Sequence, residues 1–408
     1  MTGFGKKMSV FQVLLLLGLV WGLAEAVCPN GCQCNDESLH VSCVEANLDI
    51  VPITLNPSIT RLNLRNNKIR ALDTGFHFYH QLTHIDLSHN HLVKISPGSF
   101  GQQPNLVTLF LNNNRMAHLS NVTFGTGLTS LTVLSIRENF IETIEPATFA
   151  HTRSLEELDL GSNRLKVLNT SCFVGLGNLR TLRIDKNELN QVPEVFSGKT
   201  ISSGSGSGGG FGSGSTGGFG GGGGSGSNSG SSGNNVYLPH LTELFLGTNQ
   251  IETLKDDAFA GVKNLATLDL RGNKIKSIEP FAFRGLNMLR KLVLMDNELM
   301  SVPTVAFAPL SQLELLKIGK NPIGKFDKNA FHGLRNLKTL EMQGAPELQE
   351  IDKEAFGSNS NLEHFELSKG SKLAYLPSKL FHQQSMQKLM LQVCTSFILI
   401  ALKSKVRP

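Results

Sequence analysis

Residues 265–286 read LATLDLRGNKIKSIEPFAFRGL, and this stretch decides the fold because variants of it recur along most of the chain. Its apolar residues follow the spacing Leu-x-x-Leu-x-Leu, then Ile-x-x-Ile, then Phe-x-x-Leu. A segment of this length cannot cover so many apolar side chains alone, so it must stack on copies of itself. The alternation Leu268-Asp269-Leu270 predicts a short strand with both leucines inward and Asp269 outward, and stacked copies predict a parallel sheet.

An asparagine follows each predicted strand, as Asn273 does here. Its side-chain amide can donate to and accept from backbone groups of the adjacent coil, which satisfies polar atoms that would otherwise be buried unpaired at ~1–3 kcal/mol each. The register is shared by Asn67, Asn90, Asn114, Asn139, Asn163, Asn187, Asn249, Asn273, Asn297 and Asn321. An outer ring is formed by Phe76, Phe100, Phe124, Phe149, Phe173, Phe196, Phe259, Phe283, Phe307, Phe331, Phe356 and Phe381. The strand side of each coil is thinner than the phenylalanine side, so we expect an arc with the sheet on its concave face.

These repeats resemble the extracellular leucine-rich-repeat family in its form of about 24 residues per repeat. The resemblance covers residues 59–391, apart from one interruption. It implies an α/β-type repeat solenoid, a horseshoe with a concave parallel β-sheet and an irregular or 3-10 helical convex side.

The amino terminus has the pattern of a cleaved secretory signal peptide. In residues 1–26, Lys6 and Lys7 precede an apolar run, residues 10–23, which ends in Ala24-Glu25-Ala26. A membrane anchor is the alternative, although the run is short for a bilayer span. The mature chain would begin near Val27.

Four cysteines, Cys28, Cys32, Cys34 and Cys43, lie just before the first repeat. In an exported chain they indicate two disulfides, with a structural zinc site as the alternative, and the spacing alone leaves three pairings open. The resemblance to the family's amino-terminal cap, here residues 27–58, implies Cys28 with Cys34 and Cys32 with Cys43. Such a cap would cover the edge of the first strand.

The repeats form two blocks, residues 59–198 with repeats 1–6 and residues 238–393 with repeats 7–13, the last one partial. Residues 199–237 between them are mostly Gly and Ser, which predicts a disordered insert. Because Leu238 resumes the frame, the blocks should stack as one arc with the insert looped out at little entropic cost. Two separate arcs on a tether are the alternative. Gly198-Lys199-Thr200 lacks the upstream glycine and the strand-to-helix context of a phosphate-binding loop.

The pattern loosens near the carboxyl end. Gly344 and Gly370 stand where the ladder asparagine is expected, and we interpret these repeats as degenerate rather than shaped for binding. Residues 394–408 form an atypical tail without the four-cysteine cap of secreted family members, and residues 397–402 are too short to cross a membrane. We therefore expect a truncated or alternatively spliced product, with a makeshift lid as the alternative.

No arrangement of nucleophile, base and orienting group recurs, so the sequence predicts a non-enzymatic chain without cofactor or metal. Six of the twelve histidines lie in repeats 1–3, yet only His84 and His89 fall on a strand or its exit, which favours a solvated patch over a metal site. A net charge of +5 without basic blocks interleaved with aromatic residues argues against nucleic acid as a partner. Asn121-Val122-Thr123 and Asn169-Thr170-Ser171 are glycosylation acceptors expected on the convex flank.

The outward strand positions carry no packing role and lie side by side, so the concave face is the predicted binding site. Interface centres favour aromatic residues, Met and Arg, whereas single exposed apolar residues occur on any surface. The predicted protein-binding residues are Phe110, Arg137, Glu157, Asp159, Arg183, Phe245, Asp269, Val293 and Met295.

The sequence thus predicts a secreted binding module that recognises an extracellular protein or matrix glycoprotein, in adhesion, matrix organisation or ligand capture. Family members that it resembles include chondroadherin-like matrix molecules and adhesive receptor ectodomains. The alternative is a truncated ectodomain of a transmembrane signalling receptor of the Toll-like or hormone-receptor type. No membrane span is expected in this chain.

Overall fold

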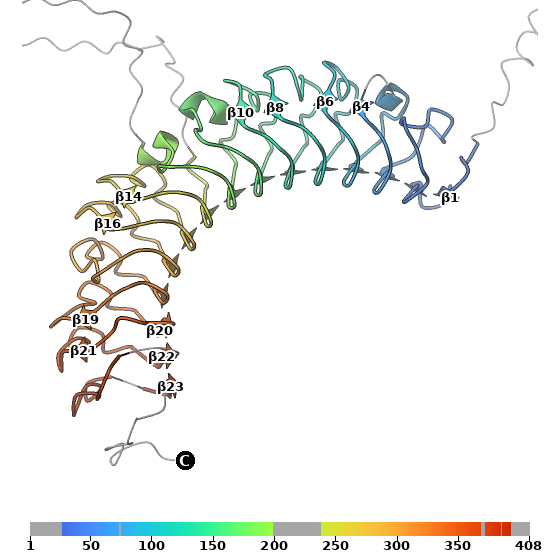
Figure 1. The fold of residues 1–408 in the computed structure, drawn as a ribbon. Helices are drawn as coiled ribbons and strands as arrows, with labels where there is room; N and C mark the ends of the chain where they lie inside the picture. Colours follow the sequence, from blue (N-terminus) through green and yellow to red (C-terminus); the bar gives the residue numbers. More distant parts are fainter. Residues whose placement is uncertain (1–26, 73–74, 199–237, 369–371, 385, 393–408) are drawn as a thin grey trace, which may run out of the picture.

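The computed structural model describes residues 27–72, 75–198, 238–368, 372–384 and 386–392. The signal peptide, the Gly/Ser-rich insert and the tail expected at residues 1–26, 199–237 and 394–408 lie outside these residues. The described residues form a curved solenoid whose concave side is lined by one long sheet (Figure 1). The predicted horseshoe is therefore confirmed.

Each turn contributes one short strand to a 15-stranded sheet within the described residues. The pairs are parallel except the first, which is an antiparallel hairpin in the cap. The strands follow the order β1 (Gln33–Asn35), β2 (His40–Ser42), β3 (Arg61–Asn63), β5 (His84–Asp86), β7 (Thr108–Phe110), β9 (Val133–Ser135), β11 (Glu157–Asp159), β12 (Thr181–Arg183), β13 (Glu243–Phe245), β15 (Thr267–Asp269), β17 (Lys291–Val293), β18 (Leu315–Lys317), β20 (Thr339–Gln343), β22 (His364–Ser368) and β23 (Lys388–Gln392).

The convex side holds only short elements. Two-residue strands pair between neighbouring turns as β4 (Ala71–Leu72) with β6 (Lys94–Ile95), β8 (His118–Leu119) with β10 (Thr143–Ile144), β14 (Thr253–Leu254) with β16 (Ser277–Ile278), and β19 (Lys325–Phe326) with β21 (Glu350–Ile351). The helical segments of the described chain are the 3-10 turns η1 (Gly75–Phe78), η2 (Thr170–Phe173) and η3 (Glu194–Ser197). An irregular convex side with 3-10 turns is what the family resemblance implied.

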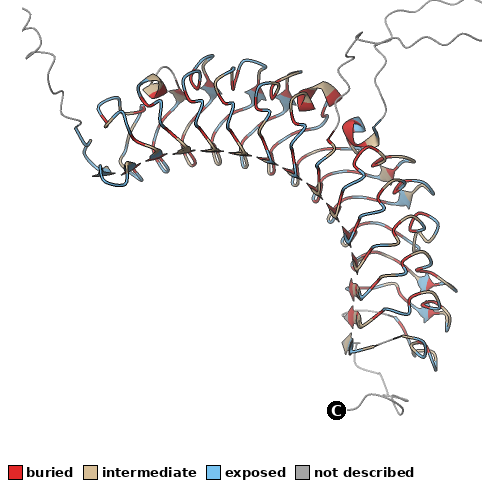
Figure 2. Cartoon of the chain, turned by 180° about the vertical axis from the view of Figure 1, so that it is seen from behind, coloured by how far each residue is buried: buried red, intermediate tan, exposed pale blue. Residues whose placement is uncertain are grey.

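The core is a continuous apolar column between the two sides (Figure 2). Leu268 and Leu270 are fully buried, as are the corresponding residues of neighbouring turns. Burying a leucine contributes about 1.5–3 kcal/mol, so the stacking of many turns supplies the stability that one turn lacks. Rings of the outer phenylalanines stack from turn to turn, for example Phe259 on Phe283 with centroids 6.2 Å apart.

The ladder asparagines connect consecutive turns. Asn273 Nδ2 donates to the carbonyl oxygens of Leu246 and Leu270 at 3.0 and 2.9 Å, and its Oδ1 accepts from the backbone N–H of Ile251 at 3.1 Å. Leu246 and Ile251 belong to the preceding turn, so one buried side chain satisfies backbone groups of two turns. This is the role predicted for these residues.

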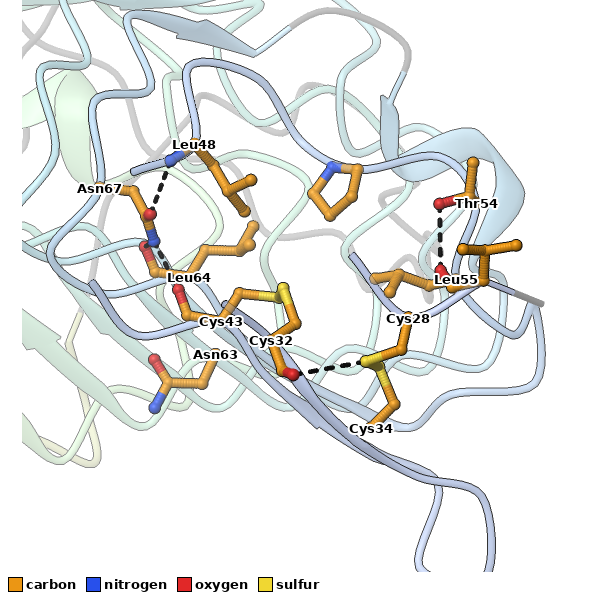
Figure 3. The surroundings of a disulfide bond; sticks show 12 residues. Cys28, Cys32, Cys34, Cys43, Leu48, Thr54, Leu55, Asn63, Leu64 and Asn67 are labelled. Atoms are coloured by element: carbon orange, nitrogen blue, oxygen red, sulfur yellow. Dashed lines mark hydrogen bonds between the residues drawn. A yellow bond between two sulfur atoms is a disulfide. The ribbon is translucent and has the colours of Figure 1, made fainter. Parts of the chain in front are cut away.

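The cap closes the amino-terminal end of the core. Cys28 is bonded to Cys34 and Cys32 to Cys43, which confirms the pairing implied by the family resemblance (Figure 3). Strand β2 of the cap pairs with β3 of the first repeat, so the first repeat has no open edge. Asn67 extends the ladder into the cap by donating to the carbonyl oxygen of Cys43 at 2.7 Å.

The two blocks of repeats meet in one sheet. Strand β12 pairs in parallel with β13, with Leu182 opposite Leu244, although these two residues are 62 positions apart along the chain. The ladder also crosses this junction, because Asn249 Nδ2 donates to the carbonyl oxygen of Ile184 at 3.0 Å. One continuous arc, rather than two separate arcs, therefore describes this structure.

Candidate functional site

The concave face carries a shallow depression, which we call the central hollow, over β9, β11, β12, β13 and β15. Its volume is about 460 Å³, and it is lined by Arg137, Asp159, Arg183, Asp185, Lys186, Phe245, Gly247, Thr248, Asp269 and Arg271. Small-molecule sites of this size have mostly apolar walls. Here most lining residues are charged, so the hollow suits polar groups of a macromolecular surface better than an apolar ligand.

The fold explains why these side chains converge. Leu158 and Leu160 point into the core and are fully buried, which leaves Asp159 between them on the concave face. The residue after the second core position of each turn also faces this side. Arg137 and Asp185 occupy that position in their turns, whereas Gly161 occupies it in the turn between them. The missing side chain opens the hollow.

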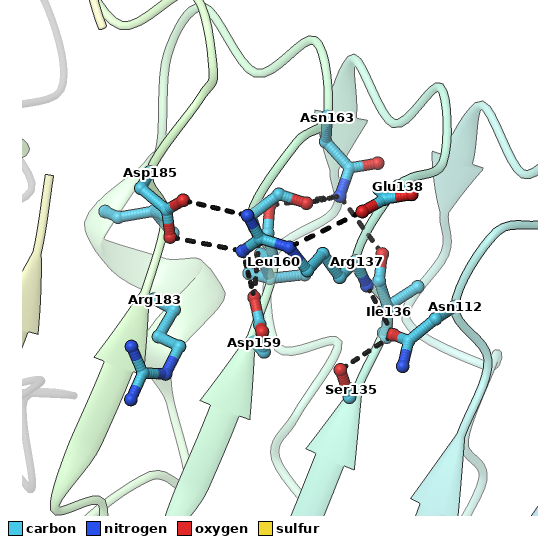
Figure 4. Close-up of polar contacts among 12 residues, drawn as sticks. Asn112, Ser135, Ile136, Arg137, Glu138, Asp159, Leu160, Asn163, Arg183 and Asp185 are labelled. Atoms are coloured by element: carbon cyan, nitrogen blue, oxygen red, sulfur yellow. Dashed lines mark hydrogen bonds and ion pairs between the residues drawn. The ribbon is translucent and has the colours of Figure 1, made fainter. Parts of the chain in front are cut away.

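Arg137 contacts two carboxylates, one on the next turn and one on the turn after that (Figure 4). It donates to both carboxylate oxygens of Asp185, at 3.3 and 3.1 Å, and its Nη1 lies 3.6 Å from Oδ1 of Asp159. A Cβ on Gly161 would collide with that Nη1, so glycine is what lets the guanidinium reach two turns away. The hydrogen bonds that Arg137 donates to Asp185, together with the charges of the nearby carboxylates, raise the pKa of Arg137, while burial raises the pKa of Asp159.

Arg183 and Phe245 form the other fixed unit of the hollow. The guanidinium carbon of Arg183 lies 4.0 Å from the ring centroid of Phe245, and its Nε lies 3.9 Å from Oε1 of Glu157. A cation–π contact at an exposed site contributes about 0.5–1 kcal/mol. The contact therefore favours one arrangement of an arginine and an aromatic ring, two side chains typical of interface centres, before any partner binds.

Two predicted contact residues are not available to a partner. Asp269 is only 3% exposed because the side chain of Arg271 folds back over it, donating from Nε to Oδ2 at 2.8 Å. Val293 is also 3% exposed, and its short side chain lies between those of Asp269 on β15 and Lys317 on β18. The prediction that Val293 is an exposed apolar contact was wrong. Asp269 orients Arg271, which is the group that faces solvent.

The structure brings five of the nine predicted residues into one hollow. These are Arg137, Asp159, Arg183, Phe245 and Asp269, with Glu157 paired to Arg183 beside them. Phe110 and Met295 are half-buried and lie outside the lining. The sequence-based prediction did not include Gly161 and Gly247, which leave room for the side chains of the hollow. They could have been recognised because other repeats carry Arg, Asp or Met at the same position.

The histidines of the first repeats do not form a metal site in the part of the chain that the structure describes. His89 Nε2 lies 3.0 Å from a guanidinium nitrogen of Arg65, and no group of three His, Cys, Asp or Glu side chains is arranged around a common point among the described residues. Within the same residues, no helix has the length and apolarity that crossing a membrane requires.

A leucine rich repeat sequence profile matches residues 57–116, 104–165, 129–189, 153–199, 239–299 and 289–346, which together exceed half of the chain. The chain is a leucine-rich-repeat protein. This leucine-rich-repeat protein is 33% identical over 180 residues to Reticulon-4 receptor-like 2 from Homo sapiens, covering 44% of the chain and 31% of that relative. It is 35% identical over 162 residues to Toll-like receptor 2 type-1 from Gallus gallus, covering 39% and 20%. Podocan from Mus musculus is 30% identical over 196 residues, covering 47% and 31%.

The leucine-rich-repeat chain thus spans less than a third of the length of these three relatives. They are non-enzymatic receptors and matrix proteins, and together with the disulfide-bonded cap they identify an extracellular leucine-rich-repeat protein. Among solved structures, a leucine-rich-repeat protein of Leptospira interrogans matches with a TM-score of 0.57 at 22% identity, covering 86% of this chain and 89% of that one. A chain from an octameric complex of Latrophilin 3, Unc5D and FLRT2 matches with a TM-score of 0.51 at 22% identity, covering 72% and 85%. Both structures show the fold alone.

Proposed function

We propose that this protein is a secreted, non-enzymatic binding module that recognises an extracellular protein or matrix glycoprotein through the central hollow. The observation that carries the proposal is the preorganised charge of that hollow, where Arg137 is held by two carboxylates and the position of Arg183 is favoured by its contacts with Phe245 and Glu157. Fixed side chains lose little entropy on binding, so such a surface is suited to recognition. In the complex of Latrophilin 3, Unc5D and FLRT2, the leucine-rich-repeat part of FLRT2 is assembled with other proteins, so this fold can serve in a protein complex.

The role within the matrix or at the cell surface is part of the same proposal. Adhesion, matrix organisation and ligand capture all require a rigid arc that binds without turnover. A second candidate is the ectodomain of a signalling receptor, and the similarity to Toll-like receptor 2 and Reticulon-4 receptor-like 2 favours it. Sequencing the full-length transcript separates the two: a cysteine-rich cap followed by about 20 apolar residues would support the receptor.

Replacing Arg183 and Phe245 together with Ala should weaken binding to an extracellular partner at least about tenfold, because arginine and aromatic anchors carry most of an interface's energy. The partner is first identified by screening the purified protein against an array of extracellular domains, and affinities are then measured by surface plasmon resonance. The predicted contact Phe110 is tested separately as Phe110→Ala.

The chain offers a matched control for the double variant. Arg284 lies over Phe281, with the guanidinium carbon 4.3 Å from the ring centroid, and it also pairs with a carboxylate, Asp257, at 3.2 Å. Phe281 follows the paired strand β16 on the convex side, away from the hollow. Phe281→Ala with Arg284→Ala should leave binding unchanged. Equal losses in both double variants would show that the central hollow is not the binding site.

Secretion and glycosylation are further parts of the proposal. Asn121 and Asn169 are exposed, and Asn169 uses only its Oδ1, as an acceptor from the backbone and side chain of Ser171. Expressed in mammalian cells, the protein should enter the medium beginning near Val27 and should lose the mass of two glycans on treatment with peptide N-glycosidase F. Replacement of both asparagines with Gln should abolish that mass shift. Retention inside the cell would contradict the proposal.

A further inference from the structure

The first three repeats differ from their neighbours in charge. Residues 59–120 contain six Lys and Arg against two Asp and Glu, whereas residues 121–198 contain seven against nine. The six basic residues are all exposed: Arg61, Arg65, Lys68, Arg70, Lys94 and Arg115. The excess of positive charge is largest in these three repeats and lies on their surface. The cap that precedes them, residues 27–58, carries four Asp and Glu and no Lys or Arg, and residues 238–393 carry 19 Lys and Arg against 17 Asp and Glu.

These six side chains form no ion pair with any acidic side chain that the structure describes. Five of the seven basic residues in residues 121–198 do form ion pairs: Arg137, Arg164, Lys166, Arg180 and Arg183. The one described carboxylate of repeats 1–3, that of Asp86, accepts from the backbone N–H of Ser88 on the concave face. Burial lowers the pKa of His84, and the positive charge of Arg61 lowers it further. The charge at this end is available to an external anion.

Four of the basic residues lie on one side of the solenoid, and we call them the basic flank: Lys68, Arg70, Lys94 and Arg115. Lys68 and Arg115 each follow a ladder asparagine by one residue, and His91 takes the same place on the turn between them. Lys94 on β6 lies opposite Ala71 on β4, directly after Arg70. Consecutive turns are about 4.8 Å apart, so Arg70 and Lys94 lie on neighbouring turns, whereas Lys68 and Arg115 lie two turns, roughly 10 Å, apart with His91 between them.

We propose that the basic flank binds a linear sulfated polysaccharide. Its charges are spread in rows over successive turns, which suits an extended polymer with anionic groups at regular intervals. The apolar side chain exposed among them is Val93. Phe140 continues the row of Lys68, His91 and Arg115 on the next turn, but the guanidinium carbon of Arg164 lies over its ring, 4.6 Å from the centroid, so the exposed aromatic ring is at the edge of the flank and not at its centre, where a protein interface would place its anchors. Sulfated polysaccharides are abundant polyanions outside cells, where this family of proteins acts. The site lies apart from the central hollow, so it is independent of the proposed function.

The repeats supply a matched pair of triple variants. Lys68, Arg70 and Lys94 occupy the first, third and fourth positions after a ladder asparagine, and Lys274, Lys276 and Lys325 occupy the same positions in later repeats. All six are exposed, and both triple replacements by Ser remove three positive charges. In the later repeats Lys276 is paired with Glu252 and Glu298, and Lys325 with Asp327. The number of charges removed and the positions within the repeat are thus held constant, and the two variants differ in location and in whether the basic side chains are already paired.

Binding is measured to immobilised heparin at several salt concentrations, with fully desulfated heparin as a second surface. The Lys68→Ser, Arg70→Ser, Lys94→Ser variant should bind heparin at least about tenfold more weakly at physiological salt and should show a smaller salt dependence, because fewer counterions are released. The Lys274→Ser, Lys276→Ser, Lys325→Ser variant should stay within about twofold of the unaltered protein. Binding to desulfated heparin should be lost in all three.

Three outcomes would overturn the proposal. Equal losses in both triple variants would mean that only net charge matters. Binding to polyglutamate or to phosphatidylserine vesicles as tight as binding to heparin would mean that the flank serves an acidic protein or a membrane surface. Absence of heparin binding by the unaltered protein at physiological salt would exclude the site outright. Circular dichroism of each variant confirms that the fold is retained.

Discussion

Replacing Asn249 with Ala is expected to lower the free energy of unfolding by about 3 kcal/mol or more, since each buried polar group left unpaired costs ~1–3 kcal/mol. Oδ1 of Asn249 accepts from the backbone N–H of Leu189 at 3.0 Å. Its Nδ2 donates to the carbonyl oxygens of Ile184 and Leu246, both at 3.0 Å. Leu189 and Ile184 lie before residues 199–237 and Leu246 lies after them. The variant therefore weakens the junction between the two blocks of repeats.

Asn249→Asp separates the role of the accepting oxygen of Asn249 from that of its donating nitrogen. The carboxylate keeps an acceptor for Leu189 but brings a buried negative charge against two carbonyl oxygens, which disfavours the charged form. Its pKa in the folded state should then exceed that in the unfolded state. The resulting destabilisation is present at neutral pH and decreases as the pH falls through the folded-state pKa. The alanine variant has no such group and should show no recovery.

Urea unfolding at neutral and mildly acidic pH measures the loss of stability in both Asn249 variants and its dependence on pH. Amide hydrogen exchange at Leu189 reports whether the hydrogen bond of its backbone N–H is lost. Asn190→Ala is the control, because Asn190 is exposed and precedes the junction by only a few residues. Unfolding curves that coincide for Asn249→Ala and Asn190→Ala would show that the ladder does not stabilise the stack.

The repeat architecture could be predicted because it follows from spacing alone. Leucines two and three residues apart, an asparagine after them and a phenylalanine further on define strand, turn and outer side in every copy. The same register crosses from Asn187 to Asn249, so the pairing of β12 with β13 also followed from the sequence. The disulfide pairing did not follow from spacing and came from family resemblance.

The site was predicted less well because exposure on the concave face depends on the reach of neighbouring side chains. Asp269 occupies an outward position, yet Arg271 covers it. The Arg137–Asp185 contact joins residues 48 positions apart and requires Gly161 between them to have no side chain. A repeat pattern specifies which positions face outward. It does not specify the side-chain conformations that decide which outward atoms a partner can reach.

Gly261→Ala is the second large effect that we expect, with a loss of about 2–3 kcal/mol of stability from overpacking. A Cβ on Gly261 would lie 2.5 Å from the backbone nitrogen of Gly198, 2.7 Å from its Cα and 3.1 Å from the carbonyl oxygen of Phe196. These are backbone atoms of the preceding turn, and unlike the end of a side chain they cannot rotate away. The shift would also disturb the 2.8 Å hydrogen bond from Gly261 N–H to the Phe196 carbonyl.

Gly177→Ala provides the opposite case, since a Cβ there meets no atom within 4 Å. Where a glycine conformation tolerates alanine, the substitution stabilises by about 0.4–1 kcal/mol because the unfolded chain loses freedom. The two variants should therefore change stability in opposite directions when measured by urea unfolding. If Gly261→Ala were as well tolerated as Gly177→Ala, the backbones of repeats 6 and 7 would not be in contact. The two blocks would then be separate arcs, and a central hollow that draws residues from both could not exist.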